Sequence, residues 1–186
     1  LDPLPGVTWF LVLAVVYLVF TEGHLPGSGA DGVRDDLCAE AIRLGRVLRE
    51  LMPDEPEAAG LLALMLLTDA RRAARVDAGG ALVTLDLQDR SLWDRTRIDE
   101  GVRVLDRAVS IRRPGPYQLQ AAIAAAHAED RPREEIVVLY DALVAMNPSP
   151  VVRLNRAVAV ALAGDVDRGL ALIDEIDMLD EYHLLH

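Results

Sequence analysis

Apolar residues recur along much of this chain every three or four positions, the spacing that places them on one face of an α-helix. The clearest case follows a glycine-rich loop, residues 23–32, where Asp31 or Asp35 can cap a helix that runs to about Met52. Its regularly spaced apolar residues are Leu37, Ala41, Leu44, Leu48 and Leu51. Further helices are predicted over residues 58–75 and 98–111 and, beyond Pro116, in shorter segments. We therefore predict an all-α fold.

The most apolar segment, residues 7–20, also reads as a helix. Its 14 residues fall short of the roughly 20 that a bilayer-spanning helix needs. It has no basic residue before it and no small-residue cleavage site after it, so a signal peptide is disfavoured. We predict a helix buried in the protein core.

The segment 61–95 differs from the rest of the chain. Residues 61–67 are apolar on every face of a helix, and a run dense in charges of both signs follows directly. Between Asp69 and Arg97 there are five Asp, six Arg and no Glu, a balance of +1, whereas the net charge of the whole chain is −11. This pattern predicts a folded polar network, and the pair of glycines at 79 and 80 allows a small β-hairpin near residues 75–85.

An internal repeat begins after Pro116. Two segments align at an offset of 35, and each follows a proline and leads through a short loop to a second helix. The aligned pairs are Leu119 with Leu154, Ala122 with Ala157, Ile123 with Val158 and Ala126 with Ala161. Because small residues let a partner helix approach closely, each unit is predicted to be an antiparallel helix pair.

These helix pairs resemble the tetratricopeptide repeat, in which each unit buries its apolar face against its neighbours. The residues that fit the repeat are Tyr140, Leu143 and Pro148 in a second helix and Gly164 with Asp165 in a turn. The resemblance predicts stacked antiparallel helix hairpins whose concave groove binds peptides or other domains. We expect residues 1–113 to form a separate helical part with the charged insert, and residues 114–186 to form the repeats, the last one incomplete.

The composition supports a helical protein without nucleic-acid affinity of its own. Apolar residues make up 52% of the chain but aromatic residues only 4%, so the core is built from aliphatic side chains and alanine. A net charge of −11 disfavours binding to phosphate backbones. The single cysteine, Cys38, excludes an internal disulfide and any CxxC zinc motif, which is typical of a cytoplasmic protein.

The histidines form only weak candidates for chemistry. His183 and His186 lie one helical turn apart, His24 is near Glu22, and His127 precedes two acidic residues. Structural roles are favoured for all of them. Because no nucleotide-binding loop, nucleophile elbow or zinc-protease motif is present, the sequence predicts no catalytic residue, no cofactor and no metal ligand.

The charged segment is the best candidate for an interaction surface. Its arginine side chains can bind carboxylates or backbone of a partner, and its tryptophan can act as an aromatic anchor. The alternative is a network of salt bridges that fastens the hairpin to the helices. The candidate residues are Asp69, Arg71, Arg72, Arg75, Asp89, Arg90, Trp93 and Asp94.

Five blocks of sequence, in order, resemble the C-terminal extension of one group of extracytoplasmic-function RNA polymerase sigma factors. The blocks are residues 14–24, 36–48, 64–95, 115–128 and 149–161, so the resemblance covers nearly the whole chain. In that family the extension follows sigma regions two and four, which direct RNA polymerase to promoters. It consists of a domain of unknown function followed by tetratricopeptide-like repeats.

The resemblance implies a regulatory, non-catalytic role by contact with the sigma regions of the same polypeptide. Promoter DNA would be reached only through those N-terminal regions, which this chain lacks. A module that senses a small ligand or peptide in the repeat groove is the alternative. A hydrolase that uses His24 and Glu22 is a remote one.

Overall fold

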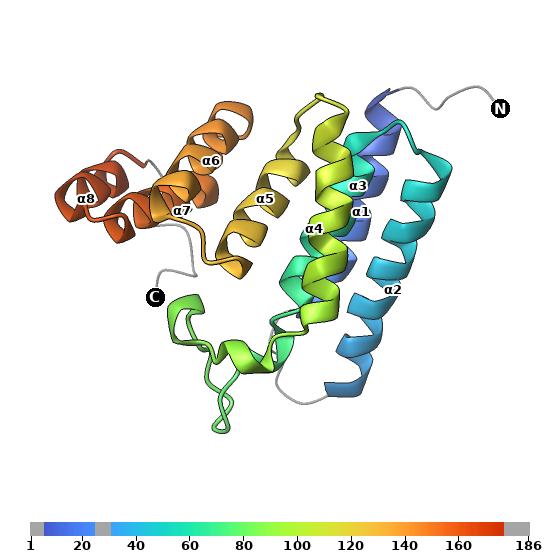
Figure 1. The fold of residues 1–186 in the computed structure, drawn as a ribbon, viewed down its shortest axis with the longest axis horizontal. Coiled ribbons are helices and arrows are strands. Elements are labelled where there is room, and N and C mark those ends of the chain that lie inside the picture. The colour runs from blue at the N-terminus through green and yellow to red at the C-terminus, as the bar shows by residue number, and fades with distance from the viewer. Residues whose placement is uncertain (1–5, 25–30, 177–186) are drawn as a thin grey trace. The chain divides into compact units, whose positions relative to one another are not determined.

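The computed structural model describes residues 6–24 and 31–176, and the regular elements in these ranges are helices (Figure 1). No strand or sheet occurs within them, so the all-α fold is confirmed. The chain divides into two compact units, which we call unit 1 (Leu1–Ala121) and unit 2 (Ala122–His186). The division falls inside α5 (Pro116–Ala128), which begins in unit 1 and ends in unit 2.

Unit 1 contains four long helices that lie side by side (Figure 1). They are α1 (Gly6–His24), α2 (Asp31–Leu51), α3 (Pro56–Asp69) and α4 (Arg95–Ser110). α1 and α2 pack against each other, and α3 packs against both of them and most extensively against α4. α3 is therefore the central helix of this unit.

α1 is a helix as predicted, but it is buried on one face only. Leu13, Val16 and Phe20 lie in the core, whereas Leu11 and Leu18 are each 62% exposed. The expectation of a fully buried helix was therefore wrong for the other face, because the helices packed against α1, chiefly α2 and α3, cover one side of it. No described helix combines the length and hydropathy needed to cross a membrane.

The buried residues of α2 are not the leucines from which its buried face was predicted. Cys38, Ala41 and Ile42 are buried, whereas Leu51 is 73% exposed. α3 approaches α2 closely at Gly45, where a Cβ would lie 2.7 Å from Met65 Cε. The larger leucines lie towards the edges of this contact.

α3 is buried along almost its whole length, and residues 61–67 are all buried, as their uniform hydrophobicity predicts. The helix begins at Pro56, whose missing N–H costs nothing in the first turn, and the side chain of Glu55 accepts a hydrogen bond from Glu57 N (3.4 Å). It ends at Asp69, earlier than the prediction of about Arg75. The reason is tertiary, because the next carbonyl, Ala70 O, accepts a hydrogen bond from Asp94 N at the start of α4 (2.8 Å).

The segment between α3 and α4 consists of short turns. Three 3₁₀ turns occupy Arg72–Ala74, Leu85–Leu87 and Arg90–Leu92. Between the first two, a tight hairpin is closed by one antiparallel bridge, Val76 with Leu82, and by a hydrogen bond from Val83 N to Arg75 O (2.8 Å). The predicted hairpin thus exists in minimal form, without extended strands.

Unit 2 contains the end of α5, α6 (Arg133–Met146), α7 (Pro150–Leu162) and α8 (Val166–Asp174). α6 packs against α7, and α7 packs against α8. Ser149 caps α7 and Asp165 caps α8, each by accepting a hydrogen bond from a backbone N–H of the first turn. α8 approaches α7 closely at Gly169, where a Cβ would lie 2.9 Å from Ala157 O.

The repeat is present, but its register is 34 residues, which is the length of the tetratricopeptide repeat, and not 35. α5 and α7 both begin at a proline, and two residues after the end of each helix comes a residue with positive φ, Asp130 (57°) or Gly164 (110°). The next N–H then bonds back into the helix, from Arg131 to Ala126 O and from Asp165 to Val160 O. The alanine-rich sequence hid this register, because a shift of one residue still aligns alanines. The equivalent pairs are Pro116 with Pro150, Ile123 with Ala157, Ala125 with Ala159 and Asp130 with Gly164.

Candidate functional site

Asp69, the last residue of α3, is the centre of the charged segment. Its side chain is only 1% exposed. One carboxylate oxygen, Oδ1, accepts hydrogen bonds from Arg72, with Nε at 2.9 Å, and the other oxygen pairs with the guanidinium of Arg97 on α4. This ion triad ties the end of α3 to the first turn of α4. Its carboxylate is buried, whereas the side chains of Arg72 and Arg97 are 31% and 43% exposed.

Arg75 connects the same region to α1. Its NH1 group donates a hydrogen bond to His24 O (2.8 Å), the last backbone carbonyl of that helix. This contact satisfies a carbonyl that has no partner within the helix, and it places a positive charge at the negative end of the helix dipole. Burial lowers the pKa of Arg75 from its ordinary value.

Trp93 is buried, with 4% of its surface exposed, and lies between two arginines. The guanidinium carbon of Arg90 is 5.0 Å from the centre of the ring, and that of Arg71 is 6.0 Å away, both within range of cation–π attraction. The ring is therefore part of the core of this segment. To anchor a partner it would have to leave this pocket.

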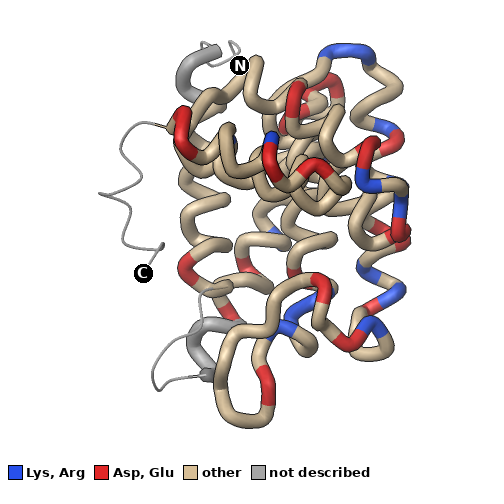
Figure 2. Tube along the Cα trace, turned by 90° about the vertical axis from the view of Figure 1, so that its left-hand side faces the viewer, with Lys and Arg blue, Asp and Glu red and all other residues tan. Residues whose placement is uncertain are grey.

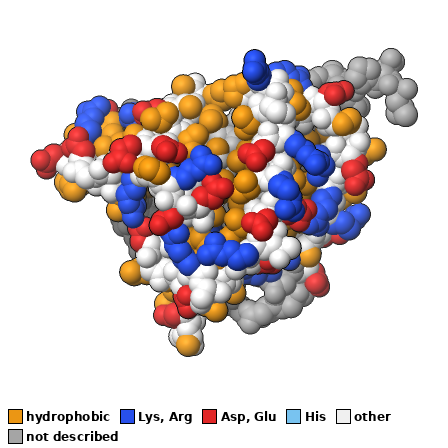
Figure 3. Space-filling view, viewed as in Figure 1, with side chains coloured by type: hydrophobic (Ala, Val, Ile, Leu, Met, Phe, Trp, Pro, Cys, Tyr) orange, Lys and Arg blue, Asp and Glu red, His pale blue; other side chains and the backbone are white. Residues whose placement is uncertain are grey.

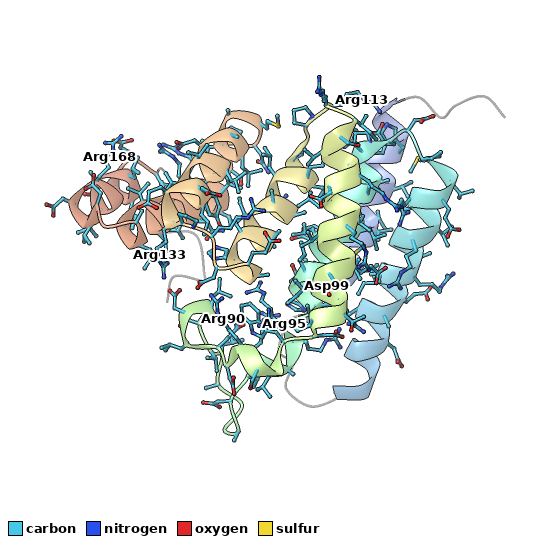
Figure 4. All side chains as sticks on the ribbon, in the orientation of Figure 1. Arg90, Arg95, Asp99, Arg113, Arg133 and Arg168 are labelled. Carbon is cyan, nitrogen blue, oxygen red and sulfur yellow. The ribbon has the colours of Figure 1, made fainter. Side chains whose placement is uncertain are left out.

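The remaining two candidates shape the backbone. Asp89 accepts a hydrogen bond from Ser91 N (2.9 Å), and Asp94 accepts one from Arg97 N (3.1 Å) at the N-terminus of α4. Both side chains are exposed, as is that of Arg90, which lies on the loop that leads into α4 (Figure 4). Figure 3 shows basic and acidic side chains next to one another on this face, with apolar side chains between them.

The structure thus gathers the eight predicted residues into one segment, in which each makes a contact that fixes the fold. Asp69, Arg72 and Arg75 fasten helices, and Trp93 is packed between arginines. These contacts fit the salt-bridge network that was the alternative to an interaction surface.

The sequence analysis did not predict a second cluster of polar side chains. The side chains of His24, Cys38 and Asp69 meet where α1 ends, where α2 begins its buried face and where α3 ends, and their donor atoms all lie within 4.8 Å of one another. Cys38 is fully buried, and its thiol lies 3.5 Å from Phe20 O. No motif spacing reveals such a cluster, because each residue comes from a different helix.

The imidazole of His24 is neutral at physiological pH. Burial lowers its pKa to about 3, with smaller contributions from the positive charges of Arg75, Arg72 and Arg71. The ring stacks on Phe20, with centroids 5.3 Å apart, and within the described residues its buried Nδ1 atom has no hydrogen-bond partner. The sequence analysis considered His24 together with Glu22, and the side chain of Glu22 is exposed.

A buried carboxylate at the other end of α3 was also missed. Glu57 is 4% exposed and accepts hydrogen bonds from Tyr117 N (2.9 Å), Gln118 N (3.0 Å) and Gln118 Nε2 (3.1 Å). It thereby caps the N-terminus of α5 from another helix. Gly115 lies directly against this carboxylate, where a Cβ would collide with it. The signal in the sequence was an acidic residue inside an otherwise apolar helix.

The other histidine candidates contribute no site. His183 and His186 lie outside the described residues. His127 is in the last turn of α5 and is half-buried. Among the described residues, the cluster around Asp69 is the one group of three metal-ligating side chain types close enough to share an ion.

Comparison with known proteins connects this architecture to a family. The chain is 50% identical over 181 residues to an uncharacterized protein of Rhizobium meliloti (strain 1021), and the match covers 94% of this chain and 43% of that protein. The chain thus spans less than half the length of this relative. No solved structure is significantly similar to it. Residues 10–109, from α1 to the end of α4, match the profile of a family of unknown function, and on this match the chain belongs to that family, DUF6596.

Proposed function

We propose that this chain is the C-terminal regulatory module of an extracytoplasmic-function sigma factor, acting in the cytoplasm by protein contact and without catalysis. The observation that carries the proposal is the resemblance of five ordered blocks to that extension, over nearly the whole chain. The length of the relative agrees with it, because more than half of that protein lies outside the matched region. Family membership is compatible with it but names no activity.

The charge distribution indicates which part of the chain would bind the sigma regions. Unit 1 contains 14 Arg against 18 Asp and Glu, whereas unit 2 contains only 5 Arg against 12 Asp and Glu. Figure 2 marks these charged positions along the chain. Sigma regions that bind DNA are basic, so the acidic unit 2 is the better partner for them, with attraction that speeds association and weakens as salt rises.

A binding measurement with matched variants tests this proposal. The chain is titrated onto sigma regions two and four of the same protein, and we expect binding at low salt that weakens as salt is raised. Neutralising Glu134 and Glu135 at the exposed start of α6, by Gln, should weaken binding, whereas Glu50→Gln with Asp99→Asn in unit 1 removes the same charge and should not. Absence of any interaction at low salt would contradict the proposal.

Transcription by the full-length factor tests the role of the charged segment. We expect Arg72→Ala and Trp93→Ala to impair transcription. Because Arg72 holds the buried Asp69 and Trp93 is itself buried, the thermal midpoint of each variant must be measured beside its activity. Impaired transcription in a variant that folds normally identifies a docking surface, and unfolding identifies a structural network.

The second candidate is a sensor of peptides or small apolar ligands. Exposed apolar side chains on both α7 and α8 favour it, namely Val158, Leu162, Val166 and Leu170, each between 44% and 57% exposed. A thermal-shift screen separates the candidates, since a ligand that binds only the folded chain raises its midpoint. If no compound or peptide raises the midpoint, docking to the sigma regions remains the simpler role.

A further inference from the structure

The cluster of His24, Cys38 and Asp69 has the composition of a metal site. It joins a thiol, an imidazole and a carboxylate from three helices, with donor atoms within 4.8 Å of one another. An ion held between a thiolate and an imidazole nitrogen spans about 4 Å, from bond lengths of about 2.3 and 2.0 Å. The donor atoms in the structure are therefore close enough to share one ion.

The imidazole of His24 is positioned to act as a ligand. The ring of His24 stacks on Phe20, with centroids 5.3 Å apart, and this contact holds its orientation in the cluster. Its Nδ1 atom is buried, and the described part of the chain offers it no hydrogen-bond partner. A buried polar atom without a partner is unfavourable, and a bound ion is one of the few things that can satisfy it.

The carboxylate is already engaged. Oδ1 of Asp69 accepts hydrogen bonds from Arg72, and Oδ2 pairs with Arg97. It therefore acts as a nearby negative charge more readily than as a ligand. The donors are then the imidazole of His24 and the thiol of Cys38, whose hydrogen bond to Phe20 O (3.5 Å) would be lost when the ion replaces the thiol proton. A donor set of one soft thiolate and one imidazole suits an ion of low coordination number.

The surrounding arginines decide which charge the ion can have. Arg72 and Arg97 contact Asp69, and Arg75 contacts the backbone of His24. A monovalent ion that replaces the thiol proton, Cys–SH + Cu⁺ → Cys–S–Cu + H⁺, leaves the total charge of this buried region unchanged. Zn²⁺ in the same exchange would add one positive charge next to three guanidinium groups, at high energetic cost in a region shielded from water.

We infer that Cys38 and His24, with Asp69 beside them, form a binding site for one Cu(I) ion. The ion would link the end of α1 to α2 next to the end of α3. His24 is the half-buried member of the three and offers the route of entry. This site is independent of the proposed contact with sigma regions, since none of its residues lies in unit 2.

Competition with a chromogenic Cu(I) chelator tests the site. The reduced, metal-free chain is titrated under anaerobic conditions, and we expect it to withdraw one Cu(I) per chain from the chelator and to remain a monomer. Cys38→Ser should lower the affinity for Cu(I) by more than about 100-fold, since it removes a direct ligand and even supporting residues contribute 10–100-fold. Cu(I) should also raise the thermal midpoint of the unaltered chain.

Two further variants keep the test decisive if Cys38→Ser fails to fold. His24→Gln removes the second donor and should also weaken Cu(I) binding, whereas His127→Gln, which removes a histidine of unit 2, should leave it unchanged. Unchanged binding in both histidine variants would overturn the site, because the ion would then not require His24.

Three other outcomes would overturn the inference. The chelator could retain all Cu(I) in the presence of the unaltered chain. One Cu(I) could bridge two chains through their cysteines, seen as a dimer at half-equivalence. Co(II), used as a coloured probe for divalent ions, could bind as tightly as Cu(I) and show a thiolate charge-transfer band that Cys38→Ser abolishes, which would refute the argument from charge.

Discussion

The two units of this chain differ in whether their charged side chains are buried. Among the described residues of unit 1, two carboxylates are buried, Glu57 and Asp69, and each is matched by several donors from other elements. In the described part of unit 2, no charged side chain is buried. Its ion pairs, such as Arg156 with Asp141, remain exposed to solvent.

This difference in the burial of charged side chains shows how the two units are stabilised. Removing one partner of a buried ion pair leaves an uncompensated charge out of water, whereas exposed pairs contribute little to stability. Unit 1 thus depends on specific polar contacts. Unit 2 depends on the packing of small and aliphatic side chains.

The largest effect is expected from Asp69→Ala. The change removes the carboxylate that Arg72 and Arg97 share. Because these two side chains are 31% and 43% exposed, water solvates part of their charge. We expect the free energy of unfolding to fall by about 3 kcal/mol, from two contacts to a charged group at about 1.5 kcal/mol each. Urea denaturation measures it. Asp99→Ala, at an exposed position of α4, is the matched control and should change stability by no more than about 0.5 kcal/mol. Equal effects of the two variants would show that unit 1 does not depend on its buried carboxylate.

Glu57→Gln is expected to have the next largest effect. The amide keeps the shape of the side chain, but it loses the charge and turns an NH₂ group towards a backbone N–H of α5. We expect a loss of about 1.5–3 kcal/mol, the range for hydrogen bonds to a charged group, again by urea denaturation. Glu50→Gln, an exposed change on α2, serves as the control. If both variants are as stable as the original chain, the cap of α5 does not matter.

The stability of the chain should depend on pH through His24. Its pKa is about 3 in the folded chain and near 6.5 when unfolded, so the unfolded chain takes up a proton first as pH falls. Stability present above pH 6.5 is therefore lost as pH falls towards 3, by at most about 1.4 kcal/mol per pH unit, and by less because the ring is partly solvated. Unfolding at pH 7 and pH 5 measures the loss. The same comparison in His24→Gln should be flatter, and parallel profiles would refute this role.

The smallest effect is expected in unit 2. Asp141→Asn breaks an exposed ion pair in which Arg156 Nε is 2.5 Å from the carboxylate, and it should cost only about 0.2–1 kcal/mol. Thermal denaturation with Arg156→Ala and the double variant isolates the pair. A coupling energy above about 2 kcal/mol would show that unit 2 also relies on specific ion pairs.

Much of the fold could be predicted from periodicity and breakers. The proline and glycine positions gave the helix boundaries near Pro56 and Pro116, and the uniform hydrophobicity of residues 61–67 identified the central helix. The end of α3 was missed because it is fixed by a contact with Asp94, which local pattern does not contain. The exposed face of α1 was missed because the hydrophobicity of a helix does not show which of its faces other helices will cover.

The candidate site was predictable in part. An abundance of Asp and Arg located the polar network, but not the burial of Asp69 or Trp93 inside it. Cys38 and His24 were considered one at a time, as a lone cysteine and a loop histidine, and only the packing of three helices brings them together. Spacing along a chain reveals ligands that share an element, and these residues do not.

The cap of α5 by Glu57 has a consequence for following the molecule in solution. The amide protons of Tyr117 and Gln118 are held by a carboxylate from α3, so their exchange with solvent deuterium reports whether α3 remains docked on α5. α5 is also the helix that continues into unit 2. Deuterium exchange at these two adjacent amides can thus follow the detachment of α3 from the start of α5, where the repeats begin.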